Sequence, residues 1–372
     1  MDAPYNPSLS VRIAARFTIV ALVIAMLMFA REIIIPFTLS VFLTFLLLPI
    51  SNWLTAKKIP HSISILISIF IAGIVLAGLI YFFYAQIISF SEDLPALKEQ
   101  FIIKMNRIQE YIFHEFNISK RSQEQWLMEK AKRTTGNSEQ IIVSLFSYTG
   151  TFLANLALIP VYAFFLTYFK EKYKMFIIMI SPSAEQKNVL GIMRQVSKVS
   201  QKYLKGILID VAILSVLNST GFLILGIEHA ILFGVLASLL NIIPYIGVLI
   251  GSLLPVAMAL LTKDSMGYAI GAAGVCIVVQ FIDNNIINPY VVGSSVSINP
   301  LSATLALVAG ALIWGIAGMI LSIPVMGVIK VICDNVPTLK PYGFLIGEER
   351  DYEHKDHYSE RFIKSMRKEK VA

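Results

Sequence analysis

The chain has 372 residues, of which 56% are hydrophobic and only 15% are charged, and its mean hydropathy is +0.71. These values exclude an ordinary water-soluble globular protein and are typical of a protein whose solvent is the lipid bilayer. The formal net charge is +7, and we expect lipid rather than nucleic acid as the partner of such a chain.

Uncharged runs long enough to cross a bilayer as a helix, which takes roughly 20 residues, recur along the whole sequence. They predict an all-α, polytopic membrane protein with about eight hydrophobic segments: 13–30, 33–50, 62–90, 141–169, 207–227, 230–262, 265–288 and 300–330. The first segment follows two arginines, as a secretory signal would, but it lacks a small-residue cleavage pattern, so we expect it to remain as an anchor. The spacing of Cys and His predicts no metal site, and we expect no cofactor.

The orientation of the chain follows from its Lys and Arg residues, because positively charged loops stay in the cytoplasm. Residues 170–205 contain eight basic and two acidic side chains, a net charge of +6, and should be cytoplasmic. Residues 91–140 contain eight side chains of each sign, so this stretch can be exported. We therefore expect both termini in the cytoplasm.

Two polar stretches have helical patterns. In 92–116 five apolar residues recur at helical spacing, so the run 62–90 should continue out of the membrane as an amphipathic helix; they are Leu97, Phe101, Met105, Ile108 and Ile112. In 183–206 the pair Ser183 and Gln186 forms a capping-box pattern ahead of a basic amphipathic helix. This helix suits either the anionic inner leaflet or the protein's own cytoplasmic face.

Two hydrophobic segments of the C-terminal half are too long for a simple span. Residues 230–262 form an uncharged run that as one helix would reach roughly 50 Å. Pro244 and Gly247 interrupt this run, and the motif WGIAG interrupts 300–330. Each segment is therefore either a helical hairpin that re-enters the bilayer or a long, kinked span.

The two alternatives for 230–262 differ in where the ends of the segment lie. In a hairpin, Lys263 and Asp264 lie on the same side as Glu228 and His229. In a span, they lie on opposite sides.

Polar residues inside apolar segments are expensive in lipid and should face protein, water or a solute. Asp210 lies a few residues after Lys202 and Lys205, so pairing with one of these lysines competes with a proton-relay role. Asn241 and Tyr245 flank the first interruption and could serve exposed backbone groups or a ligand.

The densest polarity is in the stretch QFIDNNIINPY, which begins at Gln280. Gln280, Asn284 and Asn288 stand four apart and would line one stripe of a helix, with Asp283 beside Gln280 on the same side. The amides could coordinate a hydroxyl-rich solute, and Asp283 could bind a proton or cation whose release is coupled to transport. The alternative is a helix end that emerges into water, with Pro289 stopping the helix.

The motifs NIIPYIG, QFIDNNIINPYVVGSSVSINPL and GALIWGIAGMILSIPV together resemble the AI-2E, or autoinducer-2 exporter, family of bacterial membrane transporters. The resemblance covers nearly the whole chain, and its specific motifs lie in 230–330. The residues that recur in the family correspond here to Pro244, Gly247, Gln280, Asp283, Asn284, Asn285, Pro289, Gly315, Gly318 and Pro324. Many members carry Glu in place of Asp283, and the shorter arm shifts any ion site by a methylene group.

The resemblance implies a homo-oligomeric protein of the bacterial inner membrane that exports a small polar solute such as a quorum-sensing signal, or alternatively exchanges sodium or lithium ions for protons. The chain has no P-loop pattern, so we expect an ion gradient rather than ATP hydrolysis by this chain to drive transport. The competing classes are an intramembrane enzyme with Asp210 and Asp283 as an aspartyl dyad, and a non-transporting scaffold. The acids lack the flanking motif of intramembrane aspartyl proteases, so we expect no enzyme.

The candidate transport path consists of polar residues from several segments: Asp210, Asn241, Tyr245, Gln280, Asp283, Asn284, Asn285 and Asn288. The expected division of the chain is N-terminal transmembrane helices in 1–90, an external helical subdomain in 91–140, a transmembrane helix plus the basic amphipathic helix in 141–206, a transport core in 207–331 and a cytoplasmic charged tail in 332–372.

Overall fold

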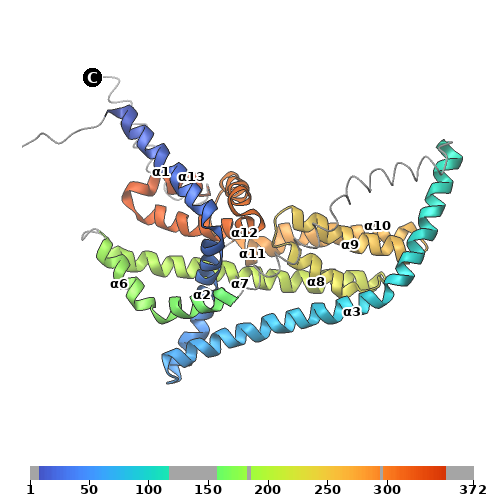
Figure 1. The fold of residues 1–372 in the computed structure, drawn as a ribbon, viewed down its shortest axis with the longest axis horizontal. Coiled ribbons are helices and arrows are strands. Elements are labelled where there is room, and N and C mark those ends of the chain that lie inside the picture. The colour runs from blue at the N-terminus through green and yellow to red at the C-terminus, as the bar shows by residue number, and fades with distance from the viewer. Residues whose placement is uncertain (1–7, 117–156, 182–185, 294–295, 349–372) are drawn as a thin grey trace, which may run out of the picture. The chain divides into compact units, whose positions relative to one another are not determined.

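The computed structural model describes residues 8–116, 157–181, 186–293 and 296–348. Every regular element within these ranges is a helix, which confirms the all-α prediction (Figure 1). The elements are α1 (Leu9–Phe29), α2 (Arg31–Ala56), α3 (His61–Phe116), α6 (Lys170–Ile180), α7 (Gln186–Ile224), α8 (Ala230–Leu240), α9 (Ile246–Thr262), α10 (Met266–Ile282), the π-helical turn η1 (Asp283–Ile287), α11 (Asn288–Val291), α12 (Pro300–Asn335), the 3-10 turn η3 (Pro337–Leu339) and α13 (Lys340–Ile346).

Several helical runs are long and apolar enough to cross a membrane, as a polytopic membrane protein requires. In the described part of the chain there are five of them: Arg31–Ala56, His61–Glu115, Asn188–Ile224, Met266–Val291 and Pro300–Asn335.

The chain divides into two compact units. The first unit consists of Met1–Leu48, Leu166–Ile207 and Asn288–Ala372, and the second of Pro49–Phe165 and Leu208–Ile287. The sequence placed a boundary between residues 206 and 207, which lie inside a single helix, α7. The division between the two units falls in the same helix, after Ile207. The expected basic amphipathic helix and the hydrophobic segment that follows it are therefore one continuous element. Ser183 of the predicted capping box lies outside the described residues.

The third hydrophobic segment continues into the polar stretch as one helix, α3, as the periodicity predicted. Pro95 lies inside α3, where its ring crowds the preceding turn, and Figure 1 shows that this helix changes direction along its length. Of the predicted apolar stripe, Leu97 is buried, whereas Phe101 is 48% exposed. Residues 117–140 of the expected external subdomain lie outside the described ranges.

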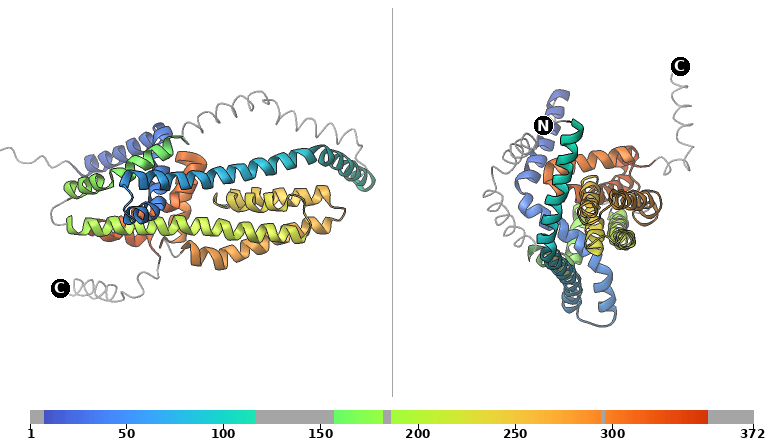
Figure 2. Two further views of the ribbon diagram at one scale, coloured as in Figure 1. Left: turned by 90° about the horizontal axis from the view of Figure 1, so that it is seen from below. Right: turned by 90° about the vertical axis from the view of Figure 1, so that its right-hand side faces the viewer.

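The core of the second unit forms where α8, α9 and α10 lie side by side (Figures 1 and 2). Small residues let these helices approach closely, which is the usual basis of helix packing in membranes. A Cβ atom at Gly221 of α7 would lie 2.4 Å from the side chain of Val275, and one at Gly251 of α9 would lie 2.9 Å from the Cα of Ala237. The resulting core includes Leu97, Phe222, Ile227, Ala230, Phe233, Met258, Ala259, Ala269 and Ala272.

The segment 230–262 is a hairpin whose arms are α8 and α9 (the first hairpin). The chain turns at residues 241–245, and the arms then pack so closely that a Cβ atom at Gly247 would lie 1.7 Å from the carbonyl oxygen of Leu240. The two ends of the segment also meet, because a Cβ atom at Gly226 would lie 3.8 Å from Nζ of Lys263. This arrangement excludes the single kinked helix that the sequence left as the alternative.

Helix α3 binds the open end of the first hairpin. Lys104 of α3 donates hydrogen bonds to the carbonyl oxygens of Leu260, at 2.5 Å, and of Lys263. These carbonyls belong to the C-terminal end of α9, where a positive charge is favourable. On the other arm, Nε2 of His229 lies 2.9 Å from Oδ2 of Asp93. The hairpin base is therefore fixed by charged and polar contacts that the apolar stripe of α3 did not predict.

In the first unit, α12 is also a hairpin (the second hairpin). Gly315 has φ +61° and ψ −136°, a conformation that interrupts the helix. A Cβ atom at Gly318 would lie 1.9 Å from the carbonyl oxygen of Gly310, although eight residues of straight helix span roughly 12 Å. Beside this tip, Nε1 of Trp314 donates a 2.9 Å hydrogen bond to the carbonyl of Leu27, near the end of α1. Pro324 lies within the second arm, which continues to Asn335.

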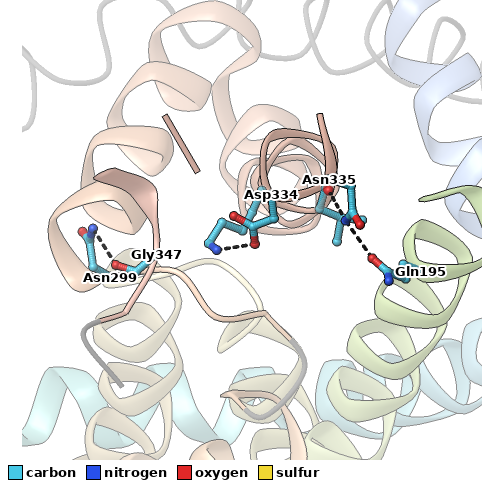
Figure 3. A network of polar contacts seen from close by, with 7 residues as sticks. Gln195, Asn299, Asp334, Asn335 and Gly347 are labelled. Carbon is cyan, nitrogen blue, oxygen red and sulfur yellow. Dashed lines mark hydrogen bonds and ion pairs between the residues drawn. The ribbon is translucent and has the colours of Figure 1, made fainter. Parts of the chain in front are cut away.

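Asn299 joins the start of the second hairpin to the end of α13 (Figure 3). Its Oδ1 accepts a hydrogen bond from the backbone N–H of Ser302 and caps the first arm, while its Nδ2 donates to the carbonyls of Leu345 and Gly347 at 2.7 and 3.2 Å. Its backbone N–H donates to the carbonyl of Ile346 at 2.9 Å. One residue thus satisfies carbonyls at the end of α13 and a free N–H at the start of α12.

Replacing Asn299 with Asp should release α13 from this position. The substitution keeps the capping oxygen but removes the amide donor, so we expect a loss of about 1–2 kcal/mol and faster hydrogen exchange in residues 340–347. Exchange measured by mass spectrometry on the purified protein tests this, with Asn335→Asp as the control for an amide near the end of the same helix. Unchanged exchange in Asn299→Asp would show that the side chain does not hold α13.

Candidate functional site

The second unit contains two buried carboxyl groups that face each other. Asp283 is the first residue of η1 and is 2% exposed, and Asp210 lies on α7 and is 8% exposed. The two groups are close enough for their charges to interact, and the Oδ1 atom of each has no hydrogen-bond partner among the described residues. Two ionised carboxylates at this distance in an apolar bundle would repel each other, so the pair calls for a proton or a cation between them. The sequence offered two kinds of partner for Asp210, a preceding lysine (Lys202 or Lys205) or, in the dyad alternative, Asp283. The structure places Asp283 beside it.

Amide side chains surround the other oxygen of Asp283. Its Oδ2 accepts a 3.1 Å hydrogen bond from Nδ2 of Asn241, at the tip of the first hairpin, and a 3.2 Å hydrogen bond from Nε2 of Gln280 on α10. Nε2 of Gln280 also donates to Oδ1 of Asn284 at 3.2 Å. Two amide donors therefore satisfy this buried oxygen. With Asp210, the structure therefore brings together five of the predicted site residues.

The helix that carries these groups changes register at Asp283. Residues 283–287 form a π-helical turn, which widens the ladder from i→i+4 to i→i+5 bonds and is frequent at functional sites. Pro289 supplies a physical reason, because its ring cannot accept the close approach of the carbonyl four residues earlier and it has no N–H to bond. The sequence left a helix end at Pro289 as an alternative, but the chain remains helical to Val291.

The change of register also alters the predicted amide stripe. Gln280 and Asn284 are joined as expected, but Asn288 lies beyond the π-turn, where the spacing of 3.6 residues no longer applies, and is exposed. The amide of Asn285 bonds the carbonyl of Phe281 in its own helix at 2.8 Å. Asn285 therefore serves the backbone rather than the acid pair.

A small cavity adjoins the acid pair within the second unit. Its volume is about 30 Å³, which holds one or two water molecules. Asn241 and Gln280, both bonded to Asp283, form part of its wall. The full wall comes from α7, α8, the hairpin tip, α9 and α10: Leu214, Asn218, Ala237, Asn241, Val248, Gly251, Ser252, Cys276, Val279 and Gln280.

Three of the cavity residues that were not predicted as site residues carry a polar or sulfur-containing side chain. Asn218 lines the cavity, and its Nδ2 also donates to Oγ of Ser238 at 3.2 Å. Ser252 and Cys276 carried no signal, because a single small polar residue in an apolar helix has many structural uses. Tyr245, predicted as a ligand contact, is 67% exposed and does not line this cavity. Within the described ranges, no three His, Cys, Asp or Glu side chains gather as a metal site.

An all-helical chain with several potential spans, two interrupted hairpins and a buried polar site has the architecture of a polytopic membrane transporter. Residues 17–338 match the sequence profile described as "AI-2E family transporter", and the chain belongs to this family.

Relatives named as transport proteins span most of the chain. The "Putative transport protein YrrI" of Bacillus subtilis is 28% identical over 314 residues, which cover 81% of this chain and 86% of that protein. The "Putative transport protein" of Haemophilus influenzae is 26% identical over 350 residues, or 90% and 95% of the two chains. The "Putative transport protein YhhT" of Escherichia coli K12 is 23% identical over 352 residues, or 94% and 98%.

Proposed function

We propose that this membrane transporter is a secondary transporter in which Asp283 and Asp210 couple the movement of a small polar solute to an ion gradient. The observation that carries the proposal is the buried acid pair, which needs a proton or a cation to be stable in an apolar bundle. Binding or release of that ion changes the charge of the site. Transport of a solute along the same path is thereby linked to the gradient.

The direction and the solute follow the family resemblance. We propose export of a small polar molecule such as a quorum-sensing signal, with exchange of sodium or lithium for protons as the second candidate. The cavity has room for one or two water molecules or a bare cation beside Asn241 and Gln280, which suits an ion as the coupling species.

We further propose that the chain works as a homo-oligomer in the bacterial inner membrane, with both termini in the cytoplasm. The basic residues of 170–205 support this orientation.

Reconstituted liposomes provide the test of substrate. Purified protein in liposomes with an imposed pH gradient is supplied in turn with autoinducer-2, sodium and lithium, and the flux of each is measured against protein-free liposomes. We expect flux of one of these that rises with the gradient. The absence of gradient-dependent flux for all three would overturn the proposal for these substrates, and hydrolysis of a membrane-embedded peptide would favour the enzyme.

A further inference from the structure

The tip of the first hairpin contains a strained turn. Tyr245 has φ +64° and ψ −56°, and the N–H of Ile246 bonds the carbonyl of Pro244 at 2.7 Å. These values define a γ-turn of the rare form with positive φ, which is costly for any residue except glycine. The ring of Tyr245 is 67% exposed, so packing of the side chain does not compensate this strain. Strain of this kind persists only where surrounding contacts hold the backbone, and it is common in parts that move.

Two contacts hold this turn in place. Gly247, directly after the turn, packs against the backbone of Leu240, which fixes how closely the arms approach. Asn241, directly before the turn, donates its amide to Oδ2 of Asp283 on the neighbouring element. This hydrogen bond joins the hairpin tip to η1.

The tip also forms part of the cavity wall. Asn241 on the tip, with Val248 and Ser252 on α9, forms one side of the cavity wall, and Cys276 and Gln280 on α10 form another. Movement of the tip away from α10 would break the bond to Asp283 and widen the cavity at the same time.

We propose that the tip of the first hairpin is a gate over the cavity, which Asn241 holds shut by its hydrogen bond to Asp283 and which the strained turn at Tyr245 favours opening. This proposal rests on the proposed function, since Asp283 is then both the coupling acid and the hydrogen-bond acceptor that keeps the gate closed. When Asp283 takes up a proton, Oδ2 loses its charge, and hydrogen bonds to a neutral acceptor are weaker than those to a carboxylate. The bond from Asn241 then no longer outweighs the strain, and the cavity opens to admit the solute.

Cys276 offers a readout that does not depend on transport, because it lines the cavity. The other cysteine, Cys333, lies in the first unit and can be replaced by Ser. In this background, the rate at which a charged, water-soluble methanethiosulfonate modifies Cys276 measures how often the gate is open. Intact folding of each variant is checked by thermal unfolding and size-exclusion chromatography.

Asn241→Ala removes the hydrogen bond to Asp283 and should raise the labelling rate of Cys276 about tenfold, as expected for one hydrogen bond to a charged group. Asn285→Ala is the matched control, because its amide bonds its own helix, and it should label like the parent. Tyr245→Gly relieves the strain of the closed turn and should lower the rate about tenfold. Tyr245→Ala removes the ring but keeps the strain, and it should label like the parent.

The outcomes separate this inference from the proposed function. Equal labelling rates in Asn241→Ala, Tyr245→Gly and the parent would overturn the gate, even if Asp283 proves necessary for flux. The predicted order of rates in a protein that transports nothing in liposomes would support the gate and overturn the transport function. A loss of labelling in Tyr245→Ala as large as in Tyr245→Gly would assign the effect to the ring and also contradict the proposal.

Discussion

Replacing Asp283 with Asn should abolish gradient-dependent transport, reducing flux to the level of protein-free liposomes, while leaving a folded protein. The amide oxygen of the new side chain can still accept the hydrogen bonds from Asn241 and Gln280, and its NH2 group can donate to the carboxylate of Asp210. The packing of a residue that is 2% exposed is therefore kept. What is lost is the ability to exchange a proton or bind a cation. Flux is measured in the same liposomes with and without the imposed gradient.

The matched control is Asp264→Asn, the same change at an exposed acid of the second unit. It should leave flux and its gradient dependence unchanged. Wild-type flux in Asp283→Asn, with the protein verified as folded, would remove Asp283 from the coupling site.

Replacing Gly247 with Ala should cause the largest loss of stability among single substitutions in the first hairpin. The added Cβ would lie 1.7 Å from the carbonyl oxygen and 2.4 Å from the carbonyl carbon of Leu240, and backbone atoms cannot move aside without separating the arms. We expect a cost above about 4 kcal/mol, seen as a low yield of folded protein and a lower unfolding temperature in detergent. Separation of the arms would also move Asn241 away from Asp283.

Gly274→Ala on α10 is the control for this prediction. A Cβ atom there meets nothing within 4 Å, so the substitution should stabilise the helix by about 0.5–1 kcal/mol. A Gly247→Ala protein that unfolds at the wild-type temperature would show that the arms are not packed as the structure has them.

The interruptions in the two long hydrophobic segments could be predicted from the sequence because their signals are local. A run of uncharged residues too long for the bilayer, broken by Pro244 and Gly247, indicates a turn without any knowledge of the rest of the fold. The same holds for Gly315, whose positive φ interrupts α12. Periodicity could not decide between hairpin and kinked span, since that choice depends on contacts between the arms.

The residues that make up the site were harder to predict from the sequence. Asp283 and Gln280 stood out as polarity within an apolar segment, but Asp210 lies 73 residues away in sequence, and no spacing rule connects the two acids. Local reasoning instead favoured the lysines that precede Asp210 along its helix. The cavity wall is harder still to foresee, because small residues such as Cys276 gain a role only from the helices opposite them.

Two backbone features could not be predicted from the sequence, because in each of them packing overrides the local preference of the residue. Pro289 normally ends a helix, yet here a π-turn accommodates it and the helix continues. Tyr245 adopts a positive φ that its type disfavours, because the close arms and the bond from Asn241 to Asp283 hold it there. The π-turn begins at Asp283 itself, and the hairpin tip that contains Tyr245 is bonded to Asp283 through Asn241. Departures from local rules are expected at the functional site of a protein.

The most direct test of coupling is the movement of protons themselves. Liposomes that contain the wild-type protein and a pH-sensitive dye are given a pH gradient, and the internal pH is followed when the transported solute or cation is added. We expect that adding the transported solute or cation dissipates the pH gradient in wild-type liposomes but not in liposomes that contain Asp283→Asn. Substrate that crosses the membrane at the same rate with and without the gradient, with no change of internal pH, would contradict it.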